Sequence, residues 1–517
     1  MMDIIKKKLQ NALKLSGFIV RSELCKVIVE KLLEEHIDLQ NKQTFDTYLK
    51  NICTSLEEQC LSDKSIEKEN ILQAVEVCLH AGYDRHETIF SVISAFDFPN
   101  FMYDSDRKIF IPNMKKPKLL PDASSKSQLF IERYNTVYQR TKRNFKRILN
   151  DNDNVIVLQT VDYLLTTTQV TLENTLILGA LLLVSEGKYY LEDPSGKVQL
   201  DLTYANYDKG FFVENCFVLV NGEYEDKILQ VATIILPPGE DYKDSRIPFG
   251  NLNYFGGSSL TPLRDSLRLK QHLQQDKYGE FLIFSDLWLD HLSVFNKLEV
   301  LFNGMEGNPP VCFIFMGNFM TDSLGSEKLD NLKKHFKQFG ELARRYQGLT
   351  NNSHFIFVPG LEDPSTSHII PRFPLPSFVT DELKKYLPKA VFTTNPCRIQ
   401  YCTREIVIFR GDILAKLMQG TVHKPKKENV SESIIKTIIS QGHLSPMSLN
   451  SLPVYWDYDY TLRLYPLPDV VIIGDKSDAY QGVHHGCTIV NPGPFCENNF
   501  HFKSYYPFSN FVTDCQL

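Results

Sequence analysis

The stretch Phe281-Leu282-Ile283-Phe284-Ser285-Asp286-Leu287-Trp288 places a short, wholly apolar run directly before a polar end. The same arrangement returns at Met316-Gly317-Asn318 and at Val358-Pro359-Gly360-Leu361-Glu362-Asp363. Short apolar runs bounded by turn residues are typical of strands that are buried on both faces of a sheet. Because residues 327–346 carry a helical pattern between two of these runs, the sequence predicts α/β layering.

Apolar runs of the same kind continue to residue 473. The runs expected to form strands are 281–284, 311–316, 355–358, 391–394, 406–409 and 470–473. Alternation of such runs with helical stretches predicts an α/β domain over residues 250–517. A Pro-containing joint at 237–248 separates it from the preceding segment.

Residues 155–240 show strands without intervening helices. Turn residues such as Asp193-Pro194-Ser195-Gly196 and Asn221-Gly222 separate the β-rich runs. These runs are 175–184, 188–192, 198–202, 217–222 and 228–236. Strands in so short a segment predict a small closed barrel such as an OB-fold. The segment has few Lys or Arg, which favours a structural or protein-binding barrel over a binder of single strands.

Residues 1–82 are expected to be helical. Apolar side chains recur at helical spacing in 5–13, 24–32, 45–56 and 71–79, with short joints between these stretches. Short helices joined in this way predict a compact bundle, whose apolar stripes we interpret as its core. A connecting region is expected at 83–154, with a linker rich in Pro, Lys and Ser at 112–128.

A basic stretch lies in the connecting region. From 133 to 147 there is no acidic residue, and Tyr134, Tyr138 and Phe145 are interleaved with the basic residues. The basic residues are Arg133, Arg140, Lys142, Arg143, Lys146 and Arg147. One interpretation is a contact with nucleic acid or an acidic partner, and the other is the solvated face of a helix. Both stay open at this point.

Composition excludes several classes of protein. With 43% hydrophobic and 12% aromatic residues, the 517-residue chain is not largely disordered. A net charge of -6 excludes a polycation that coats nucleic acid. The longest strongly apolar run, 176–184, is about half as long as a membrane span. Eleven cysteines without Cys-x-x-Cys spacing predict reduced thiols. We therefore expect an intracellular protein with no membrane contact.

The polar residues at the strand ends resemble the calcineurin-like metallophosphoesterase superfamily. Active members have Asp-x-His, Gly-Asp and Gly-Asn-His at these ends, then a lone His and Gly-His-x-His, which together hold two metal ions that activate water. The corresponding positions are Asp286, Trp288, Asn318, Leu361, Glu362, His443 and Asp475. Only Asp286 and His443 keep the family's ligands, and Lys476 would place a cation where a metal belongs. The resemblance therefore implies a sandwich that has lost its metal site.

The degenerate site predicts no catalytic residue, no metal and no cofactor, so the chain is expected not to be an enzyme. One metal ion held by Asp286, Glu362, His443 and Asp475 is the remaining metal hypothesis. The alternative function is that of an active metal-dependent phosphodiesterase or 3′-nuclease. A third hypothesis is direct binding of single-stranded DNA through the barrel.

The order of helical N-terminus, OB-like barrel and degenerate phosphoesterase domain resembles the B-family subunits of eukaryotic replicative DNA polymerases. Six strings are similar to the second subunits of DNA polymerase epsilon, at 96–99, 191–196, 254–257, 393–399, 440–444 and 453–460. The first two read Phe-Asp-Phe-Pro and Leu-Glu-Asp-Pro-Ser-Gly. The resemblance implies an α+β multidomain chain with a helical bundle, an OB-like β-barrel and an inactive α/β phosphoesterase sandwich.

The same resemblance implies an accessory subunit of DNA polymerase epsilon that acts in chromosomal DNA replication in the nucleus. In that family the accessory chain binds the metal-binding C-terminal region of the catalytic subunit. Its N-terminal helices dock on the GINS part of the replicative helicase, and DNA is a further partner within the complex. Lys115-Lys116-Pro117-Lys118 and Lys424-Pro425-Lys426-Lys427 are short candidate nuclear signals, and each is also explained as a solvated loop.

Overall fold

The computed structural model describes residues 87–517 apart from 149–156, 170, 186, 322–325 and 365–366. Within the first 86 residues it describes 2–15, 18, 22–34, 49, 52, 53, 56, 68, 70–72, 74 and 75. The chain forms two compact units. The smaller comprises Met1–Thr88, Asn251–Asn253 and Ser258–Leu263, and the larger comprises Ile89–Gly250, Tyr254–Gly257 and Arg264–Leu517.

The smaller unit contains helices α1 (Met2–Leu15) and α2 (Ser22–Glu34). Their apolar residues fall at helical spacing, and Leu13 and Ile28 are among those buried in one cluster. Described residues of the third and fourth predicted helices join this cluster: Ile52, Cys53, Leu56, Ile71, Ala74 and Val75. The first two predicted helices are confirmed, and the bounds of the other two lie outside the described residues.

The larger unit contains a closed five-stranded barrel, so the OB-fold prediction is confirmed. Its strands are β5 (Thr171–Ser185), β6 (Lys188–Asp193), β7 (Gly196–Asp201), β9 (Phe217–Glu225) and β10 (Ile228–Ile235). β5 pairs with both β6 and β9, and β10 pairs with both β9 and β7, which closes the ring. Beside it lie β4 (Leu158–Gln159), α6 (Val161–Thr166) and β8 (Asn206–Tyr207).

Helix α5 (Ser124–Ile148) precedes the barrel in the chain, and the hairpin of β2 (Phe101–Asp104) and β3 (Ile109–Pro112) precedes α5. Tyr134 and Val137 of α5 pack against barrel residues such as Phe217 and Leu219. The helix therefore buries one face against the barrel.

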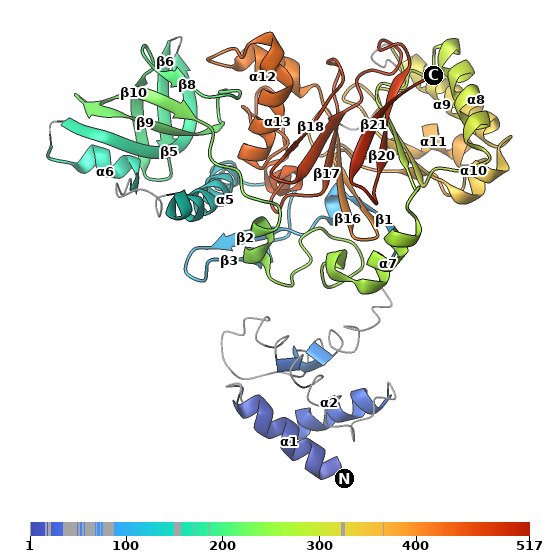
Figure 1. The fold of residues 1–517 in the computed structure, drawn as a ribbon, viewed down its shortest axis with the longest axis horizontal. Coiled ribbons are helices and arrows are strands. Elements are labelled where there is room, and N and C mark those ends of the chain that lie inside the picture. The colour runs from blue at the N-terminus through green and yellow to red at the C-terminus, as the bar shows by residue number, and fades with distance from the viewer. Residues whose placement is uncertain are drawn as a thin grey trace. The chain divides into compact units, whose positions relative to one another are not determined.

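Two six-stranded sheets form the predicted α/β sandwich (Figure 1). The first has the order β14-β13-β12-β11-β20-β21, with β11 to β14 parallel. Its strands are β11 (Phe281–Phe284), β12 (Cys312–Met316), β13 (His354–Val358), β14 (Val391–Phe392), β20 (His501–Tyr506) and β21 (Phe511–Gln516). All residues of β11 and β12 are buried, as their continuous apolar sequences require.

The second sheet has the order β1-β15-β16-β17-β19-β18. Its strands are β1 (Phe90–Ser94), β15 (Cys397–Tyr401), β16 (Arg404–Arg410), β17 (Val470–Gly474), β18 (Tyr480–His484) and β19 (Cys487–Asn491). β16 and β17 run parallel, so their carboxyl ends meet at one edge. That edge brings Arg410 beside Gly474.

Helices cover the outer faces of the sandwich. Those on the first sheet are α8 (Leu292–Met305), α9 (Ser326–Ala343), α10 (Gln347–Asn352) and α11 (Ser377–Lys384), and those on the second are α12 (Ile413–Gly420) and α13 (Val430–Gln441). A Phe-rich cluster fills the space between the first sheet and its helices. Helix α7 (Leu267–Gln275) precedes β11. Among the described residues, no helix has the length and apolarity needed to cross a membrane.

Candidate functional site

The parallel strands of the first sheet bring the predicted site residues together. Asp286 follows β11, Asn318 follows β12 and Glu362 lies beyond β13, so all three lie at the same sheet edge. The Asn318 backbone N–H donates to Asp286 Oδ1 at 3.3 Å. The Asn318 side-chain oxygen in turn accepts from the Glu362 backbone N–H at 3.0 Å. This edge is where the phosphoesterase resemblance places its metal ions.

A protein cation lies on the surviving carboxylate. Arg410, at the end of β16 in the second sheet, is completely buried, and its Nη2 donates to both oxygens of Asp286 at 2.8 and 3.1 Å. Its Nε donates to Gly317 O at 2.5 Å, and its Nη1 donates to Asp412 Oδ1 at 2.7 Å and to Gly474 O at 3.0 Å. The guanidinium is thereby bonded from both sheets of the sandwich.

Electrostatics keep Arg410 charged despite its burial. Burial by itself lowers the pKa of the guanidinium, but the carboxylates of Asp286 and Asp412 outweigh this effect and raise its pKa above the ordinary value. Arg410 therefore supplies the positive charge that a metal ion supplies in an active phosphoesterase. Unlike a metal ion, a guanidinium has no open coordination position for water, so this arrangement cannot generate a hydroxide nucleophile.

A second buried carboxylate, Asp363, holds backbone rather than a ligand. Its oxygens accept from the N–H groups of Phe319 and Gly360, at 2.9 and 2.7 Å. Burial raises the pKa of Asp363 to about 6, against the lowering effect of these bonds and of Arg372 and Arg410. Its bonds join the loop after β12 to the loop after β13.

The residues at the end of β17 are also committed to structure. Asp475 Oδ2 accepts from the N–H groups of Ile413 and Leu414, at 2.7 and 2.9 Å, and so caps helix α12. Burial raises the pKa of Asp475. The predicted cation Lys476 is partly exposed and lies 3.7 Å from Glu362. The cation on Asp286 is therefore Arg410 and not Lys476.

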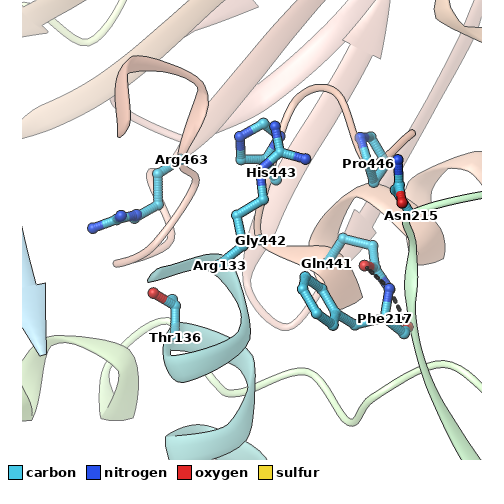
Figure 2. Close-up of a pocket in the computed structure, with 9 residues that line it drawn as sticks. All are labelled: Arg133, Thr136, Asn215, Phe217, Gln441, Gly442, His443, Pro446 and Arg463. Atoms are coloured by element: carbon cyan, nitrogen blue, oxygen red, sulfur yellow. Dashed lines mark hydrogen bonds between the residues drawn. The ribbon is translucent and has the colours of Figure 1, made fainter. Parts of the chain in front are cut away.

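His443 lies in a different pocket, which Figure 2 shows with Arg133, Gln441 and Arg463 around it. Its Nδ1 accepts from the Ser445 backbone N–H at 3.0 Å, and its Nε2 lies 3.4 Å from Asp459 Oδ2. Burial, followed by the charge of Arg133, lowers the pKa of His443. The histidine is therefore neutral at physiological pH and belongs to a structural cluster.

The last two predicted positions show no metal-binding geometry. Trp288 has its indole 5.6 Å from the His291 ring, and its backbone N–H donates to Asp286 O at 3.0 Å. Leu361 offers its carbonyl oxygen to Arg372 and to His368. Both residues contribute backbone to the loops at the strand ends.

The side chains at the predicted positions are therefore poorly arranged to bind a metal ion. Within the part of the chain that the structure describes, no three His, Cys, Asp or Glu side chains are grouped to hold one. Of the single-metal set, Asp286 is paired with Arg410, Asp475 caps α12, and His443 contacts Asp459 in its separate pocket. These residues do not form one ligand set, and we derive no step through a metal.

Two arginines of the basic stretch of α5 are buried, and a third is partly buried. Arg133, only 6% exposed, makes a bidentate pair with Asp459, at 2.9 and 2.5 Å. Arg143 is bidentate to Glu240 at 3.1 and 2.9 Å. Arg140 is 1% exposed, and burial lowers its pKa to about 10.

For Arg133 and Arg140, burial contradicts both a solvated helix face and a contact with DNA, because neither side chain reaches the surface. Lys142 is exposed and remains a candidate contact. The side chains of Lys146 and Arg147 lie outside the described residues, so their predicted contact stays a prediction.

Sequence reasoning missed Arg410 and Asp459. Arg410 directly follows the strand predicted at 406–409, and a charged residue straight after an apolar run was the one signal available for it. Asp459 lies in the string Trp456-Asp457-Tyr458-Asp459-Tyr460, which carried no indication that its carboxylate binds Arg133, 326 residues away.

The family models and the similar proteins point to the same family. Three family models match: "DNA polymerases epsilon N terminal" at residues 1–78, "DNA polymerase epsilon subunit 2-like, OB-fold domain" at 123–238, and the B-subunit model of DNA polymerases alpha and epsilon at 281–481. A solved structure described as a novel archaeal phosphodiesterase covers 46% of this chain and 99% of its own, at 14% identity and a TM-score of 0.26. That likeness is too slight to carry an argument.

The relatives share far more of their sequence with this chain. DNA polymerase epsilon subunit 2 of Homo sapiens is 38% identical, over 99% of this chain and 98% of its own length. The subunit 2 of Drosophila melanogaster is 35% identical to this chain, and that of Mus musculus is 38% identical. Each match covers 99% of this chain and 98% of the relative's own length. With this identity along nearly its full length, the chain belongs to the DNA polymerase epsilon subunit 2 family, the accessory subunits of a replicative DNA polymerase.

Proposed function

We propose that this accessory subunit is a non-catalytic scaffold. In this proposal the body, from about residue 150 to 517, binds the metal-binding C-terminal region of the catalytic subunit. The helical head, residues 1–82, attaches the polymerase to the GINS part of the replicative helicase in the nucleus. The connecting region 83–154, the barrel 155–240 and the phosphoesterase domain 250–517 complete the proposed division of the chain.

The observation that carries the non-catalytic part is the Arg410–Asp286 pair. Phosphodiester hydrolysis by this superfamily needs metal ions to activate water and to neutralise the phosphoryl oxygens. Here a guanidinium without a water ligand is bonded to the carboxylate, and Asn318 stands where a bridging aspartate is required. A buried ion pair that is also bonded to the Gly317 and Gly474 carbonyls is not readily displaced by a metal ion.

The test of this part combines metal analysis with an activity assay. We expect less than one equivalent of bound Mn²⁺, Zn²⁺ or Mg²⁺ per chain and no turnover of a phosphodiester or of 3′-ended DNA. Asp286→Ala serves as the control, because any true turnover at this site must vanish with it. Two bound equivalents with turnover that Asp286→Ala abolishes would establish the enzyme instead.

The partner assignments rest on family membership and on the separate smaller unit. Stable subunit interfaces are large and apolar, and burial of apolar area is weakly screened by salt. We therefore expect the complex with the catalytic subunit to persist at high salt and to dissociate when the partner's metal is chelated. Dissociation at moderate salt, or indifference to chelation, would contradict this assignment.

A further inference from the structure

The loop between α12 and α13 is bonded to the barrel. The Val422 N–H donates to Phe212 O at 2.9 Å, and the Phe212 N–H donates to Thr421 Oγ1 at 3.1 Å. The next residue, His423, stacks its ring on Tyr207 of β8, with centroids 4.7 Å apart and planes 6° from parallel. A loop of the phosphoesterase domain is thereby fixed against β8 and the segment that joins β8 to β9.

This loop carries uncompensated positive charge. Lys424, Lys426 and Lys427 are exposed, and in the described part of the chain none has an ion-pair partner. Other nearby lysines are neutralised, since Lys209 pairs with Glu432 at 2.9 Å and Lys436 pairs with Asp208 at 2.7 Å. The only acidic residue in the same short segment is Glu428.

Aromatic rings lie on the barrel side of this loop. The Tyr207 ring is partly exposed in its stack with His423. Tyr204, two residues before β8 begins, is 89% exposed, which is unusual for so large a ring. The barrel alone has rings but little positive charge, and the loop alone has charge but no ring larger than an imidazole. The fold combines the two.

We propose that the Lys424–Lys427 loop and the Tyr204–Tyr207 segment form a composite site for single-stranded nucleic acid. The three ammonium groups would contact backbone phosphates, and Tyr204 and the Tyr207–His423 stack would receive unpaired bases. An acidic peptide would use the lysines equally well, whereas a single strand uses both groups at every step, its phosphates on cations and its bases on open rings. The combination of unpaired cations and open rings therefore favours a nucleic acid. This function goes beyond scaffolding and does not depend on it.

The test is fluorescence anisotropy of the full-length protein with labelled oligothymidylate of about 30 nucleotides, titrated at several salt concentrations. The first variant is Lys424→Ala/Lys426→Ala/Lys427→Ala. Its matched control, Lys116→Ala/Lys118→Ala/Lys334→Ala, removes the same charge from exposed lysines elsewhere. The second variant is Tyr204→Ala, and melting temperatures verify that all variants are folded.

Three phosphate contacts on a single strand contribute about 2 to the slope of log K against log salt concentration. We expect the first variant to lose about this much slope and to bind at least tenfold more weakly, while the control keeps both. Tyr204→Ala should weaken binding about tenfold at an unchanged slope, because it removes stacking and no charge.

Equal losses in the triple variant and its control would overturn the proposal, because binding would then follow net charge alone. Unchanged affinity of Tyr204→Ala would overturn the composite site, because the ring would then contribute nothing to binding of the oligonucleotide. Absence of measurable binding by the wild-type chain would also refute it.

Discussion

Replacement of Arg410 by methionine tests whether a guanidinium has taken the structural place of the metal ions. Methionine keeps most of the buried aliphatic volume but leaves Asp286 without a countercharge. Removal of one partner of a buried ion pair costs about 3–5 kcal/mol. Because the guanidinium of Arg410 also satisfies the carbonyls of Gly317 and Gly474, we expect about 4 kcal/mol.

This free energy converts to a change in melting temperature through the entropy of unfolding. At about 2.1 cal/mol/K per residue over the roughly 270 residues of the phosphoesterase domain, 4 kcal/mol corresponds to about 7 °C. The assay is thermal unfolding by circular dichroism, with urea unfolding as a second measurement.

A double-mutant cycle makes the test specific. Arg410→Met/Asp286→Asn removes the orphaned charge, so it should recover at least about 1.5 kcal/mol relative to the single Arg410 variant. The reasoning is refuted if Arg410→Met melts within about 2 °C of the wild type. It is equally refuted if the double variant melts no higher than Arg410→Met, because the buried carboxylate would then not be the source of the cost.

Three further predictions concern other parts of the chain. Gln441→Ala should cost about 1–3 kcal/mol and make the barrel–body junction more sensitive to limited proteolysis, because the Gln441 amide satisfies both the N–H and the C=O of Phe217, at 2.8 and 2.7 Å. Asp363 has its pKa raised to about 6 in the fold, against an ordinary 3.8, so stability from its neutral form is present below about pH 4 and is lost as the pH rises through 6. The unfolding free energy of wild type minus that of Asp363→Asn should therefore fall by up to about 3 kcal/mol between pH 4 and 7, and a pH-independent difference would contradict this. A chain reduced to residues 83–517 should stay soluble and bind the catalytic subunit while losing attachment to GINS, and an aggregated product would show instead that the head is needed for folding.

Much of the fold could be predicted from the local pattern of apolar and turn residues in the sequence. The strand predicted at 281–284 coincides with β11, and the barrel strands coincide with runs that turn residues bound on both sides. Such strands are predictable because residues buried on both faces must be apolar throughout. The bounds of the third and fourth N-terminal helices remain predictions.

The candidate site was harder to predict, because its ion pairs join distant parts of the sequence. Asp286 and Arg410 are 124 residues apart and lie on different sheets, so no spacing connects them. Arg133 and Arg143 lie in a stretch, 133–147, that contains no acidic residue, yet Asp459 and Glu240 reach them through the fold. A motif position alone placed His443 at the metal site, whereas its packing against Asp459 assigns it to another cluster.

The Arg410–Asp286 pair also bears on how a sandwich of this kind can be stable without metal ions between its strand ends. Without its metal ions, a phosphoesterase site leaves buried carboxylates facing one another, which is strongly unfavourable in a medium of low polarity. Arg410 resolves this by bonding to Asp286 and to carbonyls of both sheets, and Asp475 and Asp363 are stabilised by backbone N–H groups. Each of these buried carboxylates thereby holds neighbouring segments of the fold together. These bonds hold the loops of the sandwich in place, and a rigid surface favours a permanent subunit interface, since little ordering remains to be done on binding.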